Sequence, residues 1–187
     1  MTSSDKLHEA EAKIAEAKDI VTNSISETLD HYGIAPSIGR LYGTLYFEDK
    51  ALTLDEMKEE LGMSKPSMST GVRKLQDIKM VHKVWQRGTR KDLYKAEKNF
   101  FKSFIQFFCI RWEREVEENF EAIEHSEKQL LEVINDEELP QHIREEAEKC
   151  YQQIHESRAY YQWLDKLVES FRSGEIFSYI PMEKEEK

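Results

Sequence analysis

The sequence predicts a mainly α-helical fold that contains one small β-hairpin. Glycine and proline number only 7 and 4 in 187 residues, so few positions interrupt a helix. Apolar residues recur at steps of three and four along most of the chain, which is the helical period. Between residues 81 and 96 the period changes to alternation on both sides of a polar, glycine-containing turn, and this change predicts the hairpin.

The first 32 residues are expected to form one helix and a packing or dimerisation segment of their own. Gly33 ends this helix, and Ser37 after Pro36 is expected to cap the next, a short apolar helix over residues 38–47. The apolar face of the first helix is weak, so it must pack on another part of the chain or on a partner subunit. Its members are Leu7, Ala10, Ile14, Ala17, Val21 and Ile25.

Two further helices are predicted from their capping residues. Thr53 and Glu56 form the capping-box pattern at the start of one, and Gly62 ends it. Ser64 is expected to cap the next helix, with Pro66 in its first turn, where the missing N–H costs nothing. Helix, short turn, helix and hairpin is the order of a winged helix-turn-helix, which we place at residues 33–98.

Charge is distributed unevenly along the chain. The net charge of −10 by itself argues against a nucleic-acid partner. Residues 64–95, however, hold nine basic and two acidic side chains, so this segment is +7 and the remainder −17. A basic module in an acidic body suits binding to DNA in one orientation only. The alternative is a helical protein-interaction module whose basic hairpin binds an acidic protein partner.

The predicted DNA contacts lie on the helix that begins after Ser64 and at the hairpin tip. Small hydroxyl side chains let the helix backbone approach the major groove, and basic side chains suit phosphates or the minor groove. The candidates are Lys65, Ser67, Met68, Ser69, Thr70, Arg73, Lys74, Arg87, Thr89, Arg90 and Lys91.

Two long helices are predicted after the hairpin, over residues 101–134 and 143–171. Together they make residues 99–180 a helical dimerisation and effector region, followed by a disordered tail at residues 181–187. Apolar stripes of this length cannot stay exposed, so we expect a homodimer, which would match a palindromic double-stranded operator.

Several motifs resemble the GbsR-type branch of the MarR-like winged-helix regulators. They are HYGIAPSIGRLYGTLYF at residues 31–47, MSKPSMSTGVRKLQ at 63–76, the RGTRK tip, YYQWL at 160–164 and GEIFSYIP at 174–181. The resemblance covers the chain from about residue 10 to Pro181. The tip departs from the Asp-x-Arg pattern of generic MarR proteins, so their usual wing salt bridge is not assumed.

The resemblance implies a dimeric transcriptional repressor of genes for glycine betaine synthesis or uptake in Bacillus-like bacteria, responsive in some members to choline. It also implies that residues 64–76 are the recognition helix and residues 81–96 the wing. A quaternary ammonium ion is held by aromatic faces. Our candidates for such a box are Tyr42, Tyr46, Phe104, Phe108 and Trp112.

Other functions have little support in the sequence. No nucleophile motif, phosphate-binding loop or catalytic carboxylate pair stands out, so we expect no enzyme and no cofactor. The six histidines form no i, i+4 pair, so we expect no metal site. Cys109 and Cys150 lie on apolar faces and are expected to be buried thiols. Without a transmembrane run or an apolar signal core, we expect a cytoplasmic protein and no membrane partner.

Overall fold

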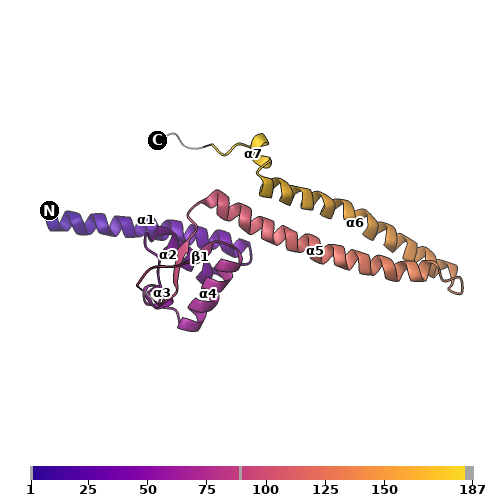
Figure 1. Ribbon diagram of the computed structural model, residues 1–187, viewed down its shortest axis with the longest axis horizontal. Coiled ribbons are helices and arrows are strands. Elements are labelled where there is room, and N and C mark those ends of the chain that lie inside the picture. Colours follow the sequence, from indigo (N-terminus) through magenta and orange to yellow (C-terminus); the bar gives the residue numbers. More distant parts are fainter. Residues whose placement is uncertain (1, 89, 184–187) are drawn as a thin grey trace. The chain divides into compact units, whose positions relative to one another are not determined.

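The computed structural model describes residues 2–88 and 90–183, and it divides into two compact units, one ending at Gln106 and one starting at Phe107. Figure 1 shows the helices and the hairpin in chain order. The elements are α1 (Ser3–His31), α2 (Pro36–Phe47), α3 (Leu54–Leu61), α4 (Lys65–Asp77), β1 (Val81–Val84), β2 (Leu93–Ala96), α5 (Phe100–Ile134), α6 (Gln141–Ser173) and α7 (Ile176–Tyr179). The predicted mainly α fold with a hairpin wing is confirmed.

Close approach of α1 and α2 holds the first unit together. Gly39 and Gly43 lie one turn apart on α2, and a Cβ built on either would come within 2.6 Å of Ser26 or Thr22 of α1. Only glycine therefore permits this crossing. The Ser26 hydroxyl also donates a hydrogen bond to the Pro36 carbonyl at 2.8 Å, which fixes the entry of α2 against α1.

The core of the first unit lies beneath α2, α3, α4 and the hairpin. Leu41, Leu45, Met57 and Leu75 are fully buried there. Tyr42 is buried beside them and donates its hydroxyl to the Glu97 carbonyl at 2.8 Å. Burial raises the pKa of this phenol to about 12, so Tyr42 remains a neutral donor.

The hairpin is antiparallel, with Val81 opposite Ala96 and Val84 opposite Leu93. Leu52 pairs with Tyr94 through two backbone hydrogen bonds of 2.9 and 2.8 Å and extends the small sheet by one bridge. The segment before α3 is thereby tied to the wing.

Most of the predicted helix boundaries are confirmed. Thr53 and Glu56 form the capping box, Gly62 adopts the left-handed conformation with φ of 64°, and Ser64 caps α4. The prediction that Ser37 caps α2 is wrong. The cap position is Ala35 and makes no side-chain hydrogen bond, because Pro36 already begins the helix.

The second unit is a hairpin of long helices, seen as the antiparallel pair α5 and α6 in Figure 1. Apolar contact between them includes Phe120 against Tyr161 and Trp112 against Phe171, with ring centroids 6.1 and 6.0 Å apart. Glu127 of α5 is buried and binds Arg158 of α6. The hairpin is therefore held by an apolar seam and by one buried ion pair.

Two sequence predictions concern particular residues of this half of the chain. Cys109 is buried as expected, but Cys150 is exposed, so the expectation of two buried thiols is wrong for the second. Cys150 lies in the exposed stretch 148–150 of α6, beyond the face that carries Ala147 inward. The disordered tail was predicted at 181–187, and residues 184–187 of it lie outside the part of the chain that the structure describes.

Candidate nucleic-acid interface

The turn between α3 and α4 sets the angle at which α4 is presented. Gly62 has a positive φ of 64° and donates its N–H to the Lys58 carbonyl, which closes α3. Two residues later, the Ser64 hydroxyl accepts the Ser67 N–H at 3.3 Å and begins α4. A chain reversal this short requires glycine at its first position and a capping hydroxyl at its last.

One face of α4 is buried and the opposite face is exposed. Met68, Val72 and Leu75 point into the core, and Gly71 lets α4 approach Leu41, whose Cδ2 lies 3.1 Å from a Cβ built on this glycine. The exposed face carries predicted DNA contacts, which are Lys65, Ser67, Thr70, Arg73 and Lys74, with Ser69 partly exposed beside them.

Met68 does not belong with those contacts. Its side chain is fully buried, so it has no surface to offer to DNA. The position falls on the inward face because it precedes Val72 by four residues and Leu75 by seven. We therefore correct its assignment from DNA contact to core residue of α4.

Asp55 joins α4 to the wing. Its carboxylate lies 2.8 Å from Lys65 Nζ, at the start of α4, and 3.3 Å from Lys91 Nζ, in the wing. Hydrogen bonds from Lys65 and then Lys91 hold the pKa of Asp55 below its usual value, so it is charged at neutral pH. The sequence does not single out Asp55 as part of this surface, because an acid in the first turn of a helix is also explained by the helix dipole.

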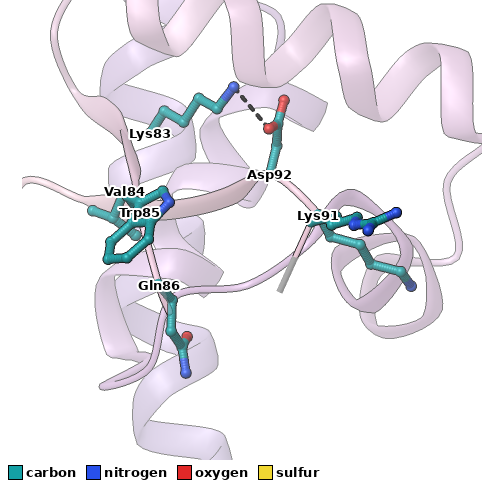
Figure 2. A pocket seen from close by; sticks show the side chains of 7 residues that line it. Lys83, Val84, Trp85, Gln86, Lys91 and Asp92 are labelled. Atoms are coloured by element: carbon teal, nitrogen blue, oxygen red, sulfur yellow. Dashed lines mark ion pairs between the residues drawn. The ribbon is translucent and has the colours of Figure 1, made fainter. Parts of the chain in front are cut away.

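The wing carries exposed basic side chains around its tip. Lys83 of β1 and Asp92, the residue before β2, form an ion pair of 2.7 Å, visible in Figure 2. A salt bridge therefore does form in this wing, although the tip lacks the generic MarR pattern. Arg87 and Arg90 are exposed, and Lys91 is exposed beside them. The predicted contact at Thr89 lies outside the described residues.

Arg73, Lys74, Arg87 and Arg90 form no ion pair within residues 2–88 and 90–183, whereas Lys65, Lys83 and Lys91 each do. Two of the four lie on α4 and two on the wing. Because no neighbouring acid neutralises them, these four side chains carry the positive potential of this surface. Such cations bind phosphates with the release of counterions from DNA.

The residues predicted for a quaternary ammonium site fall in both units. In the first, Tyr42 is buried with Tyr46 at a centroid distance of 6.2 Å, Tyr46 contacts Phe100 at 4.9 Å, and Phe104 is exposed. In the second, Phe108 and Trp112 contact each other at 5.1 Å. The structure brings together two aromatic pairs, each within its own unit.

Comparison with known proteins agrees with this arrangement. A family model described as the C-terminal helical hairpin of GbsR family transcriptional regulators matches residues 100–178. The HTH-type transcriptional repressor GbsR of Bacillus subtilis (strain 168) is 54% identical over 172 residues, which cover 92% of this chain and 95% of that protein. The chain belongs to the GbsR family of transcriptional regulators.

Other relatives fit the same family. The HTH-type transcriptional repressor OpcR of the same organism is 33% identical over 92% of this chain and 93% of its own. The putative HTH-type transcriptional regulator YvaV, also from that strain, is 36% identical over 90% of this chain and 94% of its own. A crystal structure of a transcriptional regulator, 15% identical, has a TM-score of 0.58 over 82% of this chain and 94% of that one, and it supports the fold alone.

Membership of the GbsR family makes the chain a DNA-binding transcriptional regulator and not an enzyme. Among the helices that the structure describes, none is both long and apolar enough to cross a membrane.

Proposed function

We propose that the chain represses transcription as a homodimer on a palindromic operator. In each half-site α4 enters the major groove and the wing contacts the adjacent backbone or minor groove. The observation that carries the proposal is the set of four exposed cations without ion pairs, shared between α4 and the wing. Lys65, Ser67, Ser69 and Thr70, at the N-terminal end of α4, are placed to reach base edges there.

The uncovered part of α1 supports the homodimer. Ser26 and Leu29 are the buried residues of this helix, and residues 2–21 are all exposed. Leu7, Ile14 and Val21 follow each other at steps of seven on this exposed part, and Ile14 is 58% exposed. An apolar stripe about 21 Å long needs cover, and a second copy of the same stripe supplies it with two-fold symmetry.

The proposed target genes follow from the resemblance of the sequence to the GbsR family. High identity to a transcriptional repressor over nearly the whole chain supports the repressor role. Genes for glycine betaine synthesis or uptake are the targets that the resemblance to the family implies, and we propose them here. A quaternary ammonium compound such as choline is the proposed effector. The candidate aromatic residues for its binding are Tyr42, Tyr46 and Phe104 in the first unit and Phe108 and Trp112 in the second, because aromatic faces bind a cation that cannot donate a hydrogen bond.

DNA recognition is tested by selecting duplexes from a random 30-base-pair library with the purified full chain. We expect an enriched palindrome whose half-site centres are one helical turn apart, bound as two chains per duplex in sedimentation velocity. A library that shows no enrichment after repeated selection contradicts sequence-specific DNA binding. One chain per duplex contradicts the homodimer.

The effector is tested separately, by calorimetry with choline and with glycine betaine in the absence of DNA. We expect binding of choline and a lower affinity of the choline-bound protein for the selected duplex. Absence of both effects contradicts the choline proposal and leaves the DNA proposal standing.

A further inference from the structure

Trp85 is exposed on the wing. It follows β1 directly and is 84% exposed, the largest exposed fraction among the large hydrophobic side chains of the described residues. Tryptophan normally buries much of its surface. An indole that extends into water beside a proposed DNA-binding surface therefore points to a binding partner that covers it.

The surroundings of Trp85 indicate the chemistry of that partner. The indole lines an open hollow together with Lys83, Gln86, Arg90, Lys91 and Asp92 (Figure 2). Lys83 and Asp92 pair with each other, so Arg90 leaves the hollow positive on balance. An apolar surface with a cationic rim fits a polyanion that also presents apolar faces. Double-stranded DNA has both, since deoxyribose rings lie between its phosphates.

The hollow also adjoins the recognition helix within the first unit. Lys91 lines the hollow and shares the Asp55 carboxylate with Lys65, the first residue of α4. The wing and the recognition helix thus present one basic surface. A duplex that receives α4 in its major groove brings its neighbouring minor groove to the wing.

We propose that Trp85 is a DNA-contacting residue of the wing, whose indole packs on the deoxyribose wall of the minor groove next to the half-site. Apolar side chains are used in this way by proteins that bind the minor groove. The inference rests on the proposed function and adds an uncharged contact to its cationic ones. Such a contact strengthens binding without releasing a counterion.

Replacement of the side chain gives the first test. Trp85→Ala should weaken binding of the dimer to the selected duplex about a hundredfold, because each of the two subunits loses an apolar contact of order 60 Å², which is worth about tenfold in affinity. The slope of log affinity against log salt concentration should stay unchanged, since no charge is lost. Trp163→Phe, which keeps an aromatic side chain at a 57% exposed tryptophan of α6 in the other unit, is the control and should leave the affinity unchanged.

Tryptophan emission gives the second, direct test. The wild-type protein and Trp163→Phe should both change emission on addition of the duplex, and Trp85→Phe should lose most of that change while still binding labelled DNA. In the absence of DNA, acrylamide should quench the Trp85 component readily. With the duplex bound, this quenching should fall several-fold.

The outcomes separate the two proposals. If the wild type binds the selected duplex and Trp85→Ala binds it equally well, or if Trp85→Phe keeps the full emission change, the Trp85 inference is wrong and the proposed function stands. Protection from acrylamide before DNA is added would instead place Trp85 in a protein contact, which also overturns the inference. If no duplex is bound at all, both proposals fall.

Discussion

Glu127→Gln tests how much the α5–α6 hairpin depends on its buried ion pair. Glu127 is 9% exposed, and its carboxylate accepts hydrogen bonds from Arg158 Nε at 3.0 Å and Nη2 at 2.5 Å. His155 Nδ1 lies 2.9 Å from the same carboxylate. Glutamine keeps the shape of the side chain but removes its charge, so Arg158 loses the counter-charge that it has in the hairpin.

The expected loss follows from those contacts. A hydrogen bond to a charged group contributes about 1.5–3 kcal/mol, and the amide oxygen of glutamine can replace only one of the two from Arg158. We therefore expect Glu127→Gln to lower the free energy of unfolding by about 2 kcal/mol at pH 7. For a chain of this length the corresponding decrease in Tm is about 4–8 °C.

The effect must also depend on pH in one direction. The hydrogen bonds from Arg158 lower the pKa of Glu127 from 4.5 to about 2. A carboxyl whose pKa falls on folding stabilises the protein fully above its unfolded pKa and loses that contribution as the pH falls through the folded value. The stability difference between wild type and variant should therefore shrink as the pH falls from 4.5 to about 2.

Urea unfolding followed by circular dichroism, at one protein concentration and at pH 7 and pH 3, measures both effects. Glu113→Gln is the matched control, because Glu113 also binds an α6 arginine, Arg172, through two bonds of 2.8 Å, but these side chains are 44% and 43% exposed. Exposed pairs contribute less than about 1 kcal/mol. An equal loss in both variants, or a Glu127→Gln deficit that is undiminished at pH 3, refutes the reasoning.

Three further predictions concern the DNA-binding unit. Arg90→Ala should remove one phosphate contact per subunit, so the slope of log affinity against log salt concentration should become less steep by about 1.8 for a dimer. The control Lys166→Ala, on α6, should leave this slope unchanged. If Arg90→Ala also leaves the slope unchanged, Arg90 does not contact DNA. Asp55→Asn releases Lys65 and Lys91 from their shared carboxylate. In fluorescence anisotropy, the affinity for a scrambled duplex should therefore rise several-fold more than the affinity for the selected duplex. A lower affinity for both duplexes would mean that Asp55 only holds α4 and the wing in position. Gly39→Ala places a Cβ 2.6 Å from the Ser26 Cα and should lower the free energy of unfolding, measured in urea, by about 1–3 kcal/mol. The control Ser37→Ala removes no capping bond and should lower it by less than about 0.5 kcal/mol. Comparable losses in the two variants would contradict the close crossing of α1 and α2.

Local chemistry explains why so many helix boundaries could be predicted. Thr53, Gly62 and Ser64 act through hydrogen bonds and φ angles that involve only residues one to four positions away. Such preferences hold in any tertiary setting. Ser37 failed as a cap because a second local signal, Pro36, competes at the same helix start and begins it one residue earlier.

The exposed or buried state of single side chains was harder to predict. Met68 lies within a stretch of serines and threonine that suits DNA, but its spacing of four and seven residues from Val72 and Leu75 already places it on the buried face of α4. Cys150 shares an apolar pattern with Ala147 and Ile154 but is exposed, because the face that α6 buries against α5 is narrower than the pattern suggests. For Cys150 the width of the face that α6 buries against α5 decides, and no local sequence rule contains that width.

The sequence by itself determined the fold class, the helix that begins after Ser64, the β-hairpin and the placement of positive charge in a chain of net charge −10, because these depend on periodicity, capping and residue type along a single stretch. Only the tertiary structure decided which cations are neutralised. Asp55 is 10 residues from Lys65 and 36 from Lys91, yet one carboxylate binds both, while Arg73, Lys74, Arg87 and Arg90 have no ion pair within the described residues. Ion pairing between distant segments depends on distances that packing alone sets, and that is why the sequence could locate the basic surface but not its unpaired charges.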